Sequence, residues 1–182
     1  MVVNTETISE TDFASIAKAT SAAFAHAVAE KPVTATPRIL LLHGPNLNLL
    51  GTREPATYGA TTLAQLESHL TERAAKAGFQ LDCVQSNHEG VLIDRIHATR
   101  ADGTLSCIVN AGALTHTSVA LRDAFAGASL SFLEVHITNV HAREEFRHHS
   151  FLSATARGTI AGFGVRGYDL ALDFLVHEYA AK

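Results

Sequence analysis

Residues 38–45 read Arg-Ile-Leu-Leu-Leu-His-Gly-Pro, a run of four aliphatic residues that ends at a histidine and a Gly-Pro pair. A short, continuous apolar run of this kind is typical of a strand buried on both faces of a parallel sheet. Four further strand-like runs follow along the chain, at 79–85, 105–110, 130–136 and 159–163. The chain from Arg38 onward therefore contains five predicted strands.

Helical patterns separate these strands. Thr62 and Gln65 have the spacing of a capping box, which predicts that a helix begins there. The apolar stripes of the four expected helices lie at 63–77, 92–102, 119–125 and 168–179. Apolar strands that alternate with helices indicate right-handed βαβ units around a parallel sheet. The sequence thus predicts an α/β fold, a flavodoxin-like doubly wound five-stranded parallel sheet.

Length, composition and charge exclude several classes of protein. The chain has 182 residues, enough for one domain with a sizeable core, and its net charge is −4. It has no basic run of the kind that nucleic-acid binding needs, and no stretch approaches the ~20 apolar residues of a membrane helix. Cys83 and Cys107 cannot form a disulfide framework. We therefore expect a cytoplasmic protein that binds neither nucleic acid nor a membrane.

Residues 1–37 differ in composition from the remainder, with no arginine and much Ala, Ser and Thr. Phe13, Ile16 and Phe24 fall roughly on one helical face, which predicts an extra N-terminal amphipathic helix over about residues 12–30. Lys18 is the one lysine or arginine in that stretch, so the polar face lacks the many cationic residues of a membrane-surface helix. The expected organisation is an N-terminal extension, 1–37, with a helix and a linker, followed by one domain, 38–182.

Polar residues follow the ends of three predicted strands. His43-Gly44-Pro45-Asn46 follows the first, Asn110-Ala111-Gly112 the third, and Glu134-Val-His-Ile-Thr-Asn139 the fourth. The carboxyl ends of parallel strands meet at one edge of the sheet, where folds of this kind bind their ligands. We therefore expect a binding site at this edge.

Two pairs of residues are candidates for acid–base chemistry. Glu134 and His136 are two apart on a strand, so their side chains leave the same face, and a carboxylate can fix the tautomer of an imidazole and stabilise its protonated form. Arg53 precedes Tyr58 in a loop, and a guanidinium lowers the pKa of a phenol from its ordinary value of about 10. By spacing alone both pairs also fit structural roles, as a capped histidine at a strand end and as a stacked pair in a loop.

The sequence gives less support to nucleotide binding, metal binding or Schiff-base chemistry. The loop 44–51 has neither the P-loop ending nor the G-x-G-x-x-G spacing, which disfavours nucleotide binding. The chain has 11 histidines, but no H-E-x-x-H or C-x-x-C spacing, so we expect no metal. Two of the four lysines lie in the extension, and Lys76 and Lys182 end helical patterns, so none is placed for a Schiff base at the strand ends.

Five motifs together resemble type II 3-dehydroquinate dehydratase. In chain order they are 44–51 (Gly-Pro-Asn-Leu-Asn-Leu-Leu-Gly), Arg53-Glu-Pro with Tyr58-Gly, 85–90 (Gln-Ser-Asn-His-Glu-Gly), 114–118 (Leu-Thr-His-Thr-Ser) and 134–147 (Glu-Val-His-Ile-Thr-Asn-Val-His-Ala-Arg-Glu-Glu-Phe-Arg). The resemblance runs from about Ile39 to the C-terminus without a large gap. It implies a hydro-lyase that converts 3-dehydroquinate to 3-dehydroshikimate, in the shikimate pathway or in quinate breakdown, without a metal or an organic cofactor. The fold alone also permits a non-catalytic flavodoxin-like binding domain.

The resemblance implies a role for each catalytic residue. Tyr58 would be the base that removes a proton from the carbon next to the ketone, and Arg53 would keep the phenol ionised. Asn46 would help to stabilise the enolate through a bound water. His136 would be the general acid for the departing hydroxyl, with Glu134 orienting its ring.

The resemblance also implies how substrate and partner subunits are bound. Its substrate contacts match Asn110, His116, Arg147 and the backbone amides of Ile137 and Thr138. Asp123 matches an aspartate that reaches into a neighbouring subunit's site, and Arg143 an arginine of the mobile loop that closes the pocket. The family's usual assembly implies a homo-oligomer, a dodecamer built from trimers.

The chain departs from the family pattern at two positions near the expected site. Thr138 stands where serine is usual, which keeps the hydroxyl and adds a methyl group. Ala113 stands where glycine is common, and this requires a backbone angle that alanine can adopt.

Overall fold

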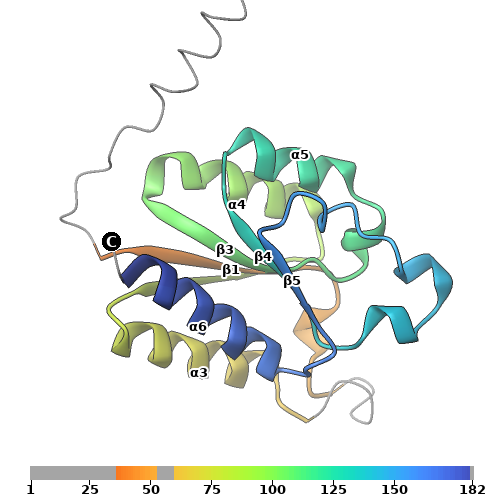
Figure 1. Cartoon of the computed structure of the whole chain (residues 1–182), viewed down its shortest axis with the longest axis horizontal. Helices are drawn as coiled ribbons and strands as arrows, with labels where there is room; N and C mark the ends of the chain where they lie inside the picture. The colour runs from red at the N-terminus through yellow and green to blue at the C-terminus, as the bar shows by residue number, and fades with distance from the viewer. Residues whose placement is uncertain (1–35, 53–59, 181–182) are drawn as a thin grey trace, which may run out of the picture. The chain divides into compact units, whose positions relative to one another are not determined.

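A computed structural model describes residues 36–52 and 60–180. Over these residues the chain forms one five-stranded, all-parallel sheet with the order β2-β1-β3-β4-β5 (Figure 1). The strands are β1 (Arg38–His43), β2 (Gln80–Gln85), β3 (Thr104–Asn110), β4 (Phe132–His136) and β5 (Gly158–Ala161). This strand order is that of the flavodoxin-like doubly wound fold, so the predicted fold class is confirmed. The N-terminal helix predicted over residues 12–30 lies outside the described residues.

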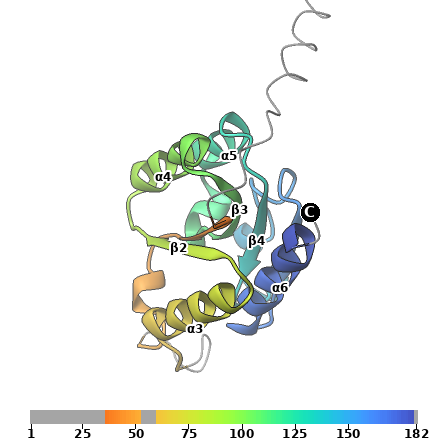
Figure 2. The ribbon, with the colours of Figure 1, turned by 90° about the vertical axis from the view of Figure 1, so that its left-hand side faces the viewer.

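Two helices cover each face of the sheet. The helices α3 (Leu63–Lys76) and α6 (Arg166–Ala180) lie on one face, and α4 (Glu89–Asp102) and α5 (Val119–Gly127) on the other (Figures 1 and 2). Ile39 and Leu41 of β1 pack into the core with α3 and α6, whereas Leu40 and Leu42 pack with α4 and α5. Because both faces are covered, the strand is apolar at every position from Ile39 to Leu42 and not at alternate ones.

Local signals in the sequence place the start of α3 and the end of α4. The Thr62 hydroxyl accepts the Gln65 N–H at 3.2 Å, and the Gln65 side chain accepts the Thr62 N–H at 2.9 Å, so the predicted capping box begins α3. The helix α4 ends at Gly103, whose φ of 82° is the left-handed conformation that glycine adopts at little cost.

Two strand boundaries differ by two residues from their predicted positions, and others differ by one. The strand β4 begins at Phe132 and not at Leu130, because the Leu130 N–H bonds the Phe125 carbonyl and thereby closes α5. The strand β5 ends at Ala161, since Gly162 turns the chain with φ 89° and leaves Phe163 61% exposed. In both places a hydrogen bond or a turn that the apolar pattern does not encode ends the regular structure.

Short 3₁₀ helices follow three of the strands at their carboxyl ends. In the part of the chain that the structure describes, η1 (Leu47–Leu49) follows β1, η2 (Gly112–His116) follows β3, and η3 (Val140–Ala142) and η4 (Glu145–Arg147) follow β4. These four segments hold the connecting loops close to the end of the sheet, which is where the sequence places its candidate site.

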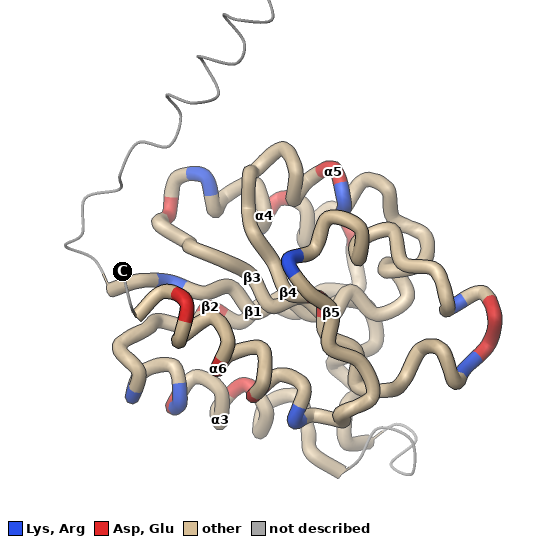
Figure 3. Tube along the Cα trace, in the orientation of Figure 1, with Lys and Arg blue, Asp and Glu red and all other residues tan. Residues whose placement is uncertain are grey.

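Charges of both signs are distributed over the described surface. In the view of Figure 3, lysine and arginine are interspersed with aspartate and glutamate along the helices and loops. Within residues 36–52 and 60–180, the structure contains no helix that is long and apolar enough to cross a membrane.

Candidate active site

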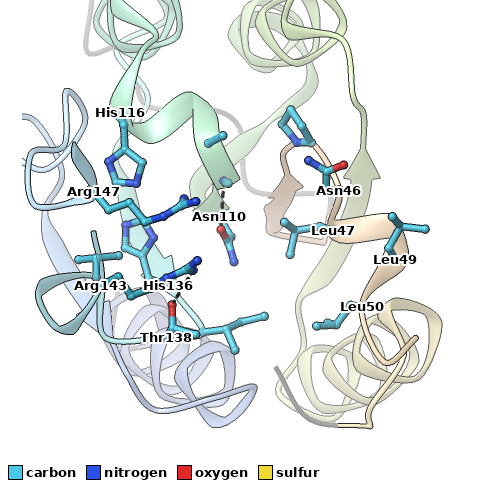
Figure 4. A pocket seen from close by; sticks show the side chains of 15 residues that line it. Asn46, Leu47, Leu49, Leu50, Asn110, His116, His136, Thr138, Arg143 and Arg147 are labelled. Carbon is cyan, nitrogen blue, oxygen red and sulfur yellow. Dashed lines mark hydrogen bonds between the residues drawn. The ribbon is translucent and has the colours of Figure 1, made fainter. Parts of the chain in front are cut away.

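A cavity of about 180 Å³ opens at the carboxyl ends of β1, β3 and β4. In Figure 4, Asn46 and the leucines of η1 lie on one side, and His116, His136, Thr138, Arg143 and Arg147 on the other. The lining residues are Pro45, Asn46, Leu47, Leu49, Leu50, Asn110, Gly112, Ala113, His116, His136, Ile137, Thr138, Val140, Arg143 and Arg147. The structure thus brings together eight of the twelve residues that the sequence singles out.

Glu134 and His136 form a buried pair behind this cavity. The His136 Nε2 lies 2.8 Å from the Glu134 Oε1, and the two residues are 7% and 0% exposed. Because Nε2 faces the carboxylate, the other ring nitrogen, Nδ1, is left for the cavity. The spacing on β4 therefore produces the same-face pair that the sequence predicts.

Hydroxyl groups complete the environment of Glu134. Ser150 donates to Oε1 at 2.7 Å, and Ser153 and Thr159 donate to Oε2 at 2.5 and 3.5 Å. Burial alone would raise the pKa of Glu134, but the hydrogen bonds from His136, Ser153 and Ser150 outweigh burial and hold that pKa below its ordinary value. Glu134 is therefore a carboxylate near neutral pH, with its acceptor sites occupied.

Two arginines give the cavity a positive wall. The Arg147 Nε donates to the Glu144 Oε2 at 2.8 Å, and the Arg143 Nε lies 3.4 Å from the same oxygen. Arg143 also donates to the Thr138 hydroxyl at 3.4 Å. Among the described lining residues there is no aspartate or glutamate. A cavity with two guanidinium groups and two imidazoles favours a small anion.

The loop that carries Asn46 has a constrained backbone. Asn46 has φ 68°, a left-handed conformation that asparagine adopts more readily than most residues. The Asn87 side chain accepts its N–H at 2.9 Å and holds it in this conformation. Close by, a Cβ on Gly44 would lie 2.2 Å from the Ala111 carbonyl oxygen, so only glycine fits there. This close approach places the β1 and β3 loops side by side.

A backbone contact orients His116 at the cavity. Its Nδ1 lies 2.7 Å from the His149 carbonyl oxygen, so that nitrogen carries the proton. The ring is also stacked against His136, with centroids 6.4 Å apart and 16° between the planes. The other ring nitrogen of His116, Nε2, does not bind that carbonyl and can contact a ligand.

Several predicted site residues stand apart from the cavity lining. Glu134 lies behind His136, and Asp123 is exposed on α5. Ile137 lines the cavity with its side chain buried in the core, 6% exposed, so its main chain is the part left for a ligand. Arg53 and Tyr58 lie outside the described residues. Ala113 is not among the described residues with a positive φ, so alanine adopts the required angle without strain.

Sequence reasoning missed two groups of residues at the site. Leu47, Leu49 and Leu50 form the apolar side of the cavity, whereas the sequence gives a role only to Asn46 of the same motif. Ser150 and Ser153 reach Glu134 from a loop whose course no spacing rule predicts. Across the described parts of the chain, no three His, Cys, Asp or Glu side chains are placed to hold a metal ion.

The fold is that of a flavodoxin-like α/β protein, and its cavity holds a histidine paired with a carboxylate beside two arginines. The family model of class II dehydroquinases matches residues 37–176, and the chain belongs to this family.

Relatives and solved structures agree with that family. The chain is 60% identical over 138 residues to a 3-dehydroquinate dehydratase of Xanthomonas oryzae pv. oryzae, which covers 76% of this chain and 93% of the relative. It is 56% identical over 153 residues to 3-dehydroquinate dehydratase 1 of Ralstonia nicotianae, covering 84% and 98%. The crystal structure of type II dehydroquinase from Propionibacterium acnes is similar with a TM-score of 0.73 and 43% identity, over 77% of this chain and 96% of that one.

Proposed function

We propose that this protein is a 3-dehydroquinate dehydratase, a hydro-lyase that removes water from 3-dehydroquinate to give 3-dehydroshikimate through an enolate. The buried Glu134–His136 pair, which opens onto a cavity with two arginines, carries this proposal in a chain that belongs to the class II dehydroquinases. The substrate is a small carboxylate with hydroxyl groups and a ketone, and the guanidinium and imidazole groups of the cavity suit it.

In the first step Tyr58, as the phenolate, takes a proton from the carbon next to the ketone. Arg53 keeps the phenol ionised through its positive charge. The electron pair of the broken C–H bond moves into the ketone and forms the enolate. Asn46 stabilises the enolate oxygen through a bound water. These roles come from the resemblance of the motifs, since Arg53 and Tyr58 are outside the described residues.

In the second step the enolate collapses and the hydroxyl group leaves. Its C–O bond breaks as His136, in the protonated form, gives a proton from Nδ1, so that water departs and a conjugated ketone remains. Glu134 supports this role because it holds Nε2 at 2.8 Å and balances the charge of an imidazolium. Three donors to Glu134 keep the carboxylate fixed, and thereby the ring.

The other residues bind the substrate. In this proposal the contacts to the substrate come from Asn110, His116, Arg147 and the backbone amides of Ile137 and Thr138, and all five residues line the cavity. Arg143 belongs to the loop that closes the cavity. In the proposed dodecamer of trimers, Asp123 serves a neighbouring subunit's site, and its exposure on α5 suits that role. No metal or organic cofactor takes part in the proposed steps.

We place the reaction in the shikimate pathway in the cytoplasm, with quinate breakdown as the alternative context. Neither Cys83 nor Cys107 is in a disulfide, and burial raises the pKa of the Cys83 thiol to about 11. Two unreactive thiols of this kind suit a reducing compartment.

An absorbance assay of the conjugated product tests the reaction and its base together. Wild-type protein should convert 3-dehydroquinate, and Tyr58→Phe should fold normally but lose a factor of about 10² to 10⁴ in kcat, the usual contribution of a general base. Tyr179→Phe is the matched control, because it removes a phenol from the far end of α6 and should retain wild-type kcat.

Two outcomes would contradict the proposal. A folded wild-type protein that binds the substrate without turnover would favour the non-catalytic binding domain. Near-normal kcat in Tyr58→Phe would remove Tyr58 from its role while leaving the reaction itself in place.

A further inference from the structure

A chain of buried polar groups lies behind the cavity wall, between the sheet and α6. The Asn110 Nδ2 donates to the Tyr168 hydroxyl oxygen at 2.8 Å, and that oxygen lies 3.4 Å from the His43 Nδ1. His43 and Tyr168 are both 0% exposed and Asn110 is 5% exposed. The sequence pattern assigns Tyr168 only to the apolar stripe of a helix, and it gives His43 no role.

The donors and acceptors of this chain fit in only one direction. The Gly112 N–H donates to the Asn110 Oδ1 at 3.1 Å, which fixes the other end of the amide as the donor to Tyr168. The Tyr168 oxygen therefore accepts from Asn110, and its single hydrogen is left for the His43 Nδ1. That nitrogen has to be unprotonated to accept it.

His43 meets this requirement. Burial lowers its pKa to about 3, so its ring is neutral at ordinary pH. Since Nδ1 accepts the Tyr168 hydrogen in this arrangement, the ring proton is on Nε2. Among the described residues Nε2 has no hydrogen-bond partner, and the Glu67 Oε1 on α3 lies 3.7 Å away. Burial also raises the pKa of Glu67. The chain thus ends at a neutral imidazole, which within the described residues is hydrogen-bonded to Tyr168.

A flipped Asn110 amide would break this arrangement at both ends. Its NH₂ group would then face the Gly112 N–H, and two hydrogen-bond donors would stand opposite each other without an acceptor. Its oxygen would draw the Tyr168 hydrogen away from His43 and leave the buried Nδ1 without a donor, and an unsatisfied buried polar group is costly. The chain therefore holds the amide of Asn110 in one orientation.

We propose that Tyr168 and His43 are positioning residues, which fix the Asn110 amide so that one N–H and one oxygen lone pair face the cavity. A substrate hydroxyl can accept from that N–H and donate to that oxygen, so the chain selects a hydroxyl at this position. This inference rests on the proposed function for the identity of the substrate. The hydrogen-bonded chain itself depends only on contacts within the domain.

A double-mutant cycle tests whether Tyr168 acts through Asn110. Tyr168→Phe keeps the ring and removes the hydroxyl that accepts from Asn110 and donates to His43, so kcat/KM for 3-dehydroquinate should fall by about tenfold, mainly through KM. In the Asn110→Ala background, adding Tyr168→Phe should cause no further loss. Tyr179→Phe, which removes a phenol from the same helix, should leave kcat/KM unchanged. Losses that multiply in the double variant, or an unchanged KM in Tyr168→Phe, would overturn the proposal.

A measurement on the wild-type protein separates this proposal from the assigned reaction and remains available if Tyr168→Phe fails to fold. In ¹⁵N-histidine NMR spectra at pH 5, the His43 ring should be neutral, with its proton on Nε2 and with Nδ1 showing the shift of a hydrogen-bond acceptor. A protonated ring or the opposite tautomer would overturn the chain, whatever the protein's activity. Absence of turnover by the wild-type protein would instead contradict the proposed function. The NMR spectra of His43 would then still test the hydrogen-bonded chain.

Discussion

At the scale of single residues, Glu134 combines complete burial with a retained negative charge. A buried carboxylate is costly unless it is hydrogen-bonded, and Glu134 has contacts from His136 and from three hydroxyl groups. Ser150 also accepts the N–H groups of Leu152 and Ser153, so the donor is itself held in place. The environment of the acid–base pair is therefore built by the loop 150–153 and by Thr159 of β5, and not by β4 alone.

Replacing Glu134 by glutamine tests this environment. The variant has nearly the same shape but lacks the charge, so an imidazolium at His136 loses its counter-charge and its fixed orientation. We expect kcat to fall by about 10²-fold, the lower end of a general acid's contribution. Steady-state rates of product formation measure the change.

Glu72→Gln is the matched control for Glu134→Gln. Its side chain is 66% exposed and pairs only with Lys76 one turn later on α3, so its kcat should equal that of the wild type. A Glu134→Gln enzyme with wild-type kcat would show that His136 needs no carboxylate.

At the scale of elements, α3 and α6 are joined by ion pairs on their shared side of the sheet. Asp169 on α6 accepts the His69 Nε2 at 2.8 Å and pairs with Arg73, and both partners belong to α3. Arg166 lies 3.6 Å from the other Asp169 oxygen. Burial alone would raise the pKa of Asp169, but the bonds from His69 and Arg73 outweigh it and lower that pKa below its ordinary value of 3.8.

The lowered pKa makes a prediction about acid stability. Since the folded state binds the proton less tightly than the unfolded state, the contribution of Asp169 is fully present above about pH 4 and is lost as pH falls through the lowered pKa. We expect Asp169→Asn to lower the free energy of unfolding at pH 7 by about 2 kcal/mol, the scale of hydrogen bonds to a charged group. Urea unfolding at pH 7 and pH 3 should show the difference from wild type shrinking at the lower pH.

Asp173→Asn provides the control on the same helix. Asp173 also pairs with Arg73, but its side chain is 60% exposed, so its removal should cost less than about 1 kcal/mol. Equal losses of unfolding free energy in the two variants would contradict this account of Asp169. So would a gap between Asp169→Asn and wild type that grows as the pH falls.

The elements also show where sequence reasoning succeeds and where it stops. The run 39–42 predicts a doubly covered strand because burial of both faces leaves no place for a polar residue, and the structure has it buried throughout. The Glu134–His136 pair follows from the two-residue period of a strand. In contrast, Ser150, Ser153 and Asn87 reach their partners through loops, and neither period nor propensity determines the course of a loop. The link from Tyr168 to Asn110 joins residues 58 positions apart, and only the packing of α6 on the sheet brings them together.

At the scale of the whole molecule, the region that matches the family model, residues 37–176, does not include residues 1–34. The Xanthomonas oryzae relative aligns over 138 residues that make up 93% of its length, which leaves little of it to correspond to the extension. The hydrogen bond between the start of the domain and β2 involves Pro37, whose carbonyl accepts the Gln80 N–H at 2.9 Å, and residues 1–34 take no part in it. Deletion of residues 1–34 should therefore leave kcat and KM for 3-dehydroquinate unchanged.

The same deletion should change the assembly. The predicted helix has an apolar face with Phe13, Ile16 and Phe24, and such a face is stable in water only against another apolar surface. We expect this helix to pack within the oligomer, so its loss should lower the mass measured by light scattering or the thermal midpoint. Full-length protein with Ile16→Glu and Phe24→Glu should reproduce the effect, because these changes remove the apolar face and keep the chain length. Identical mass and midpoint in wild type, deletion and double variant would show that the extension has no part in the assembly.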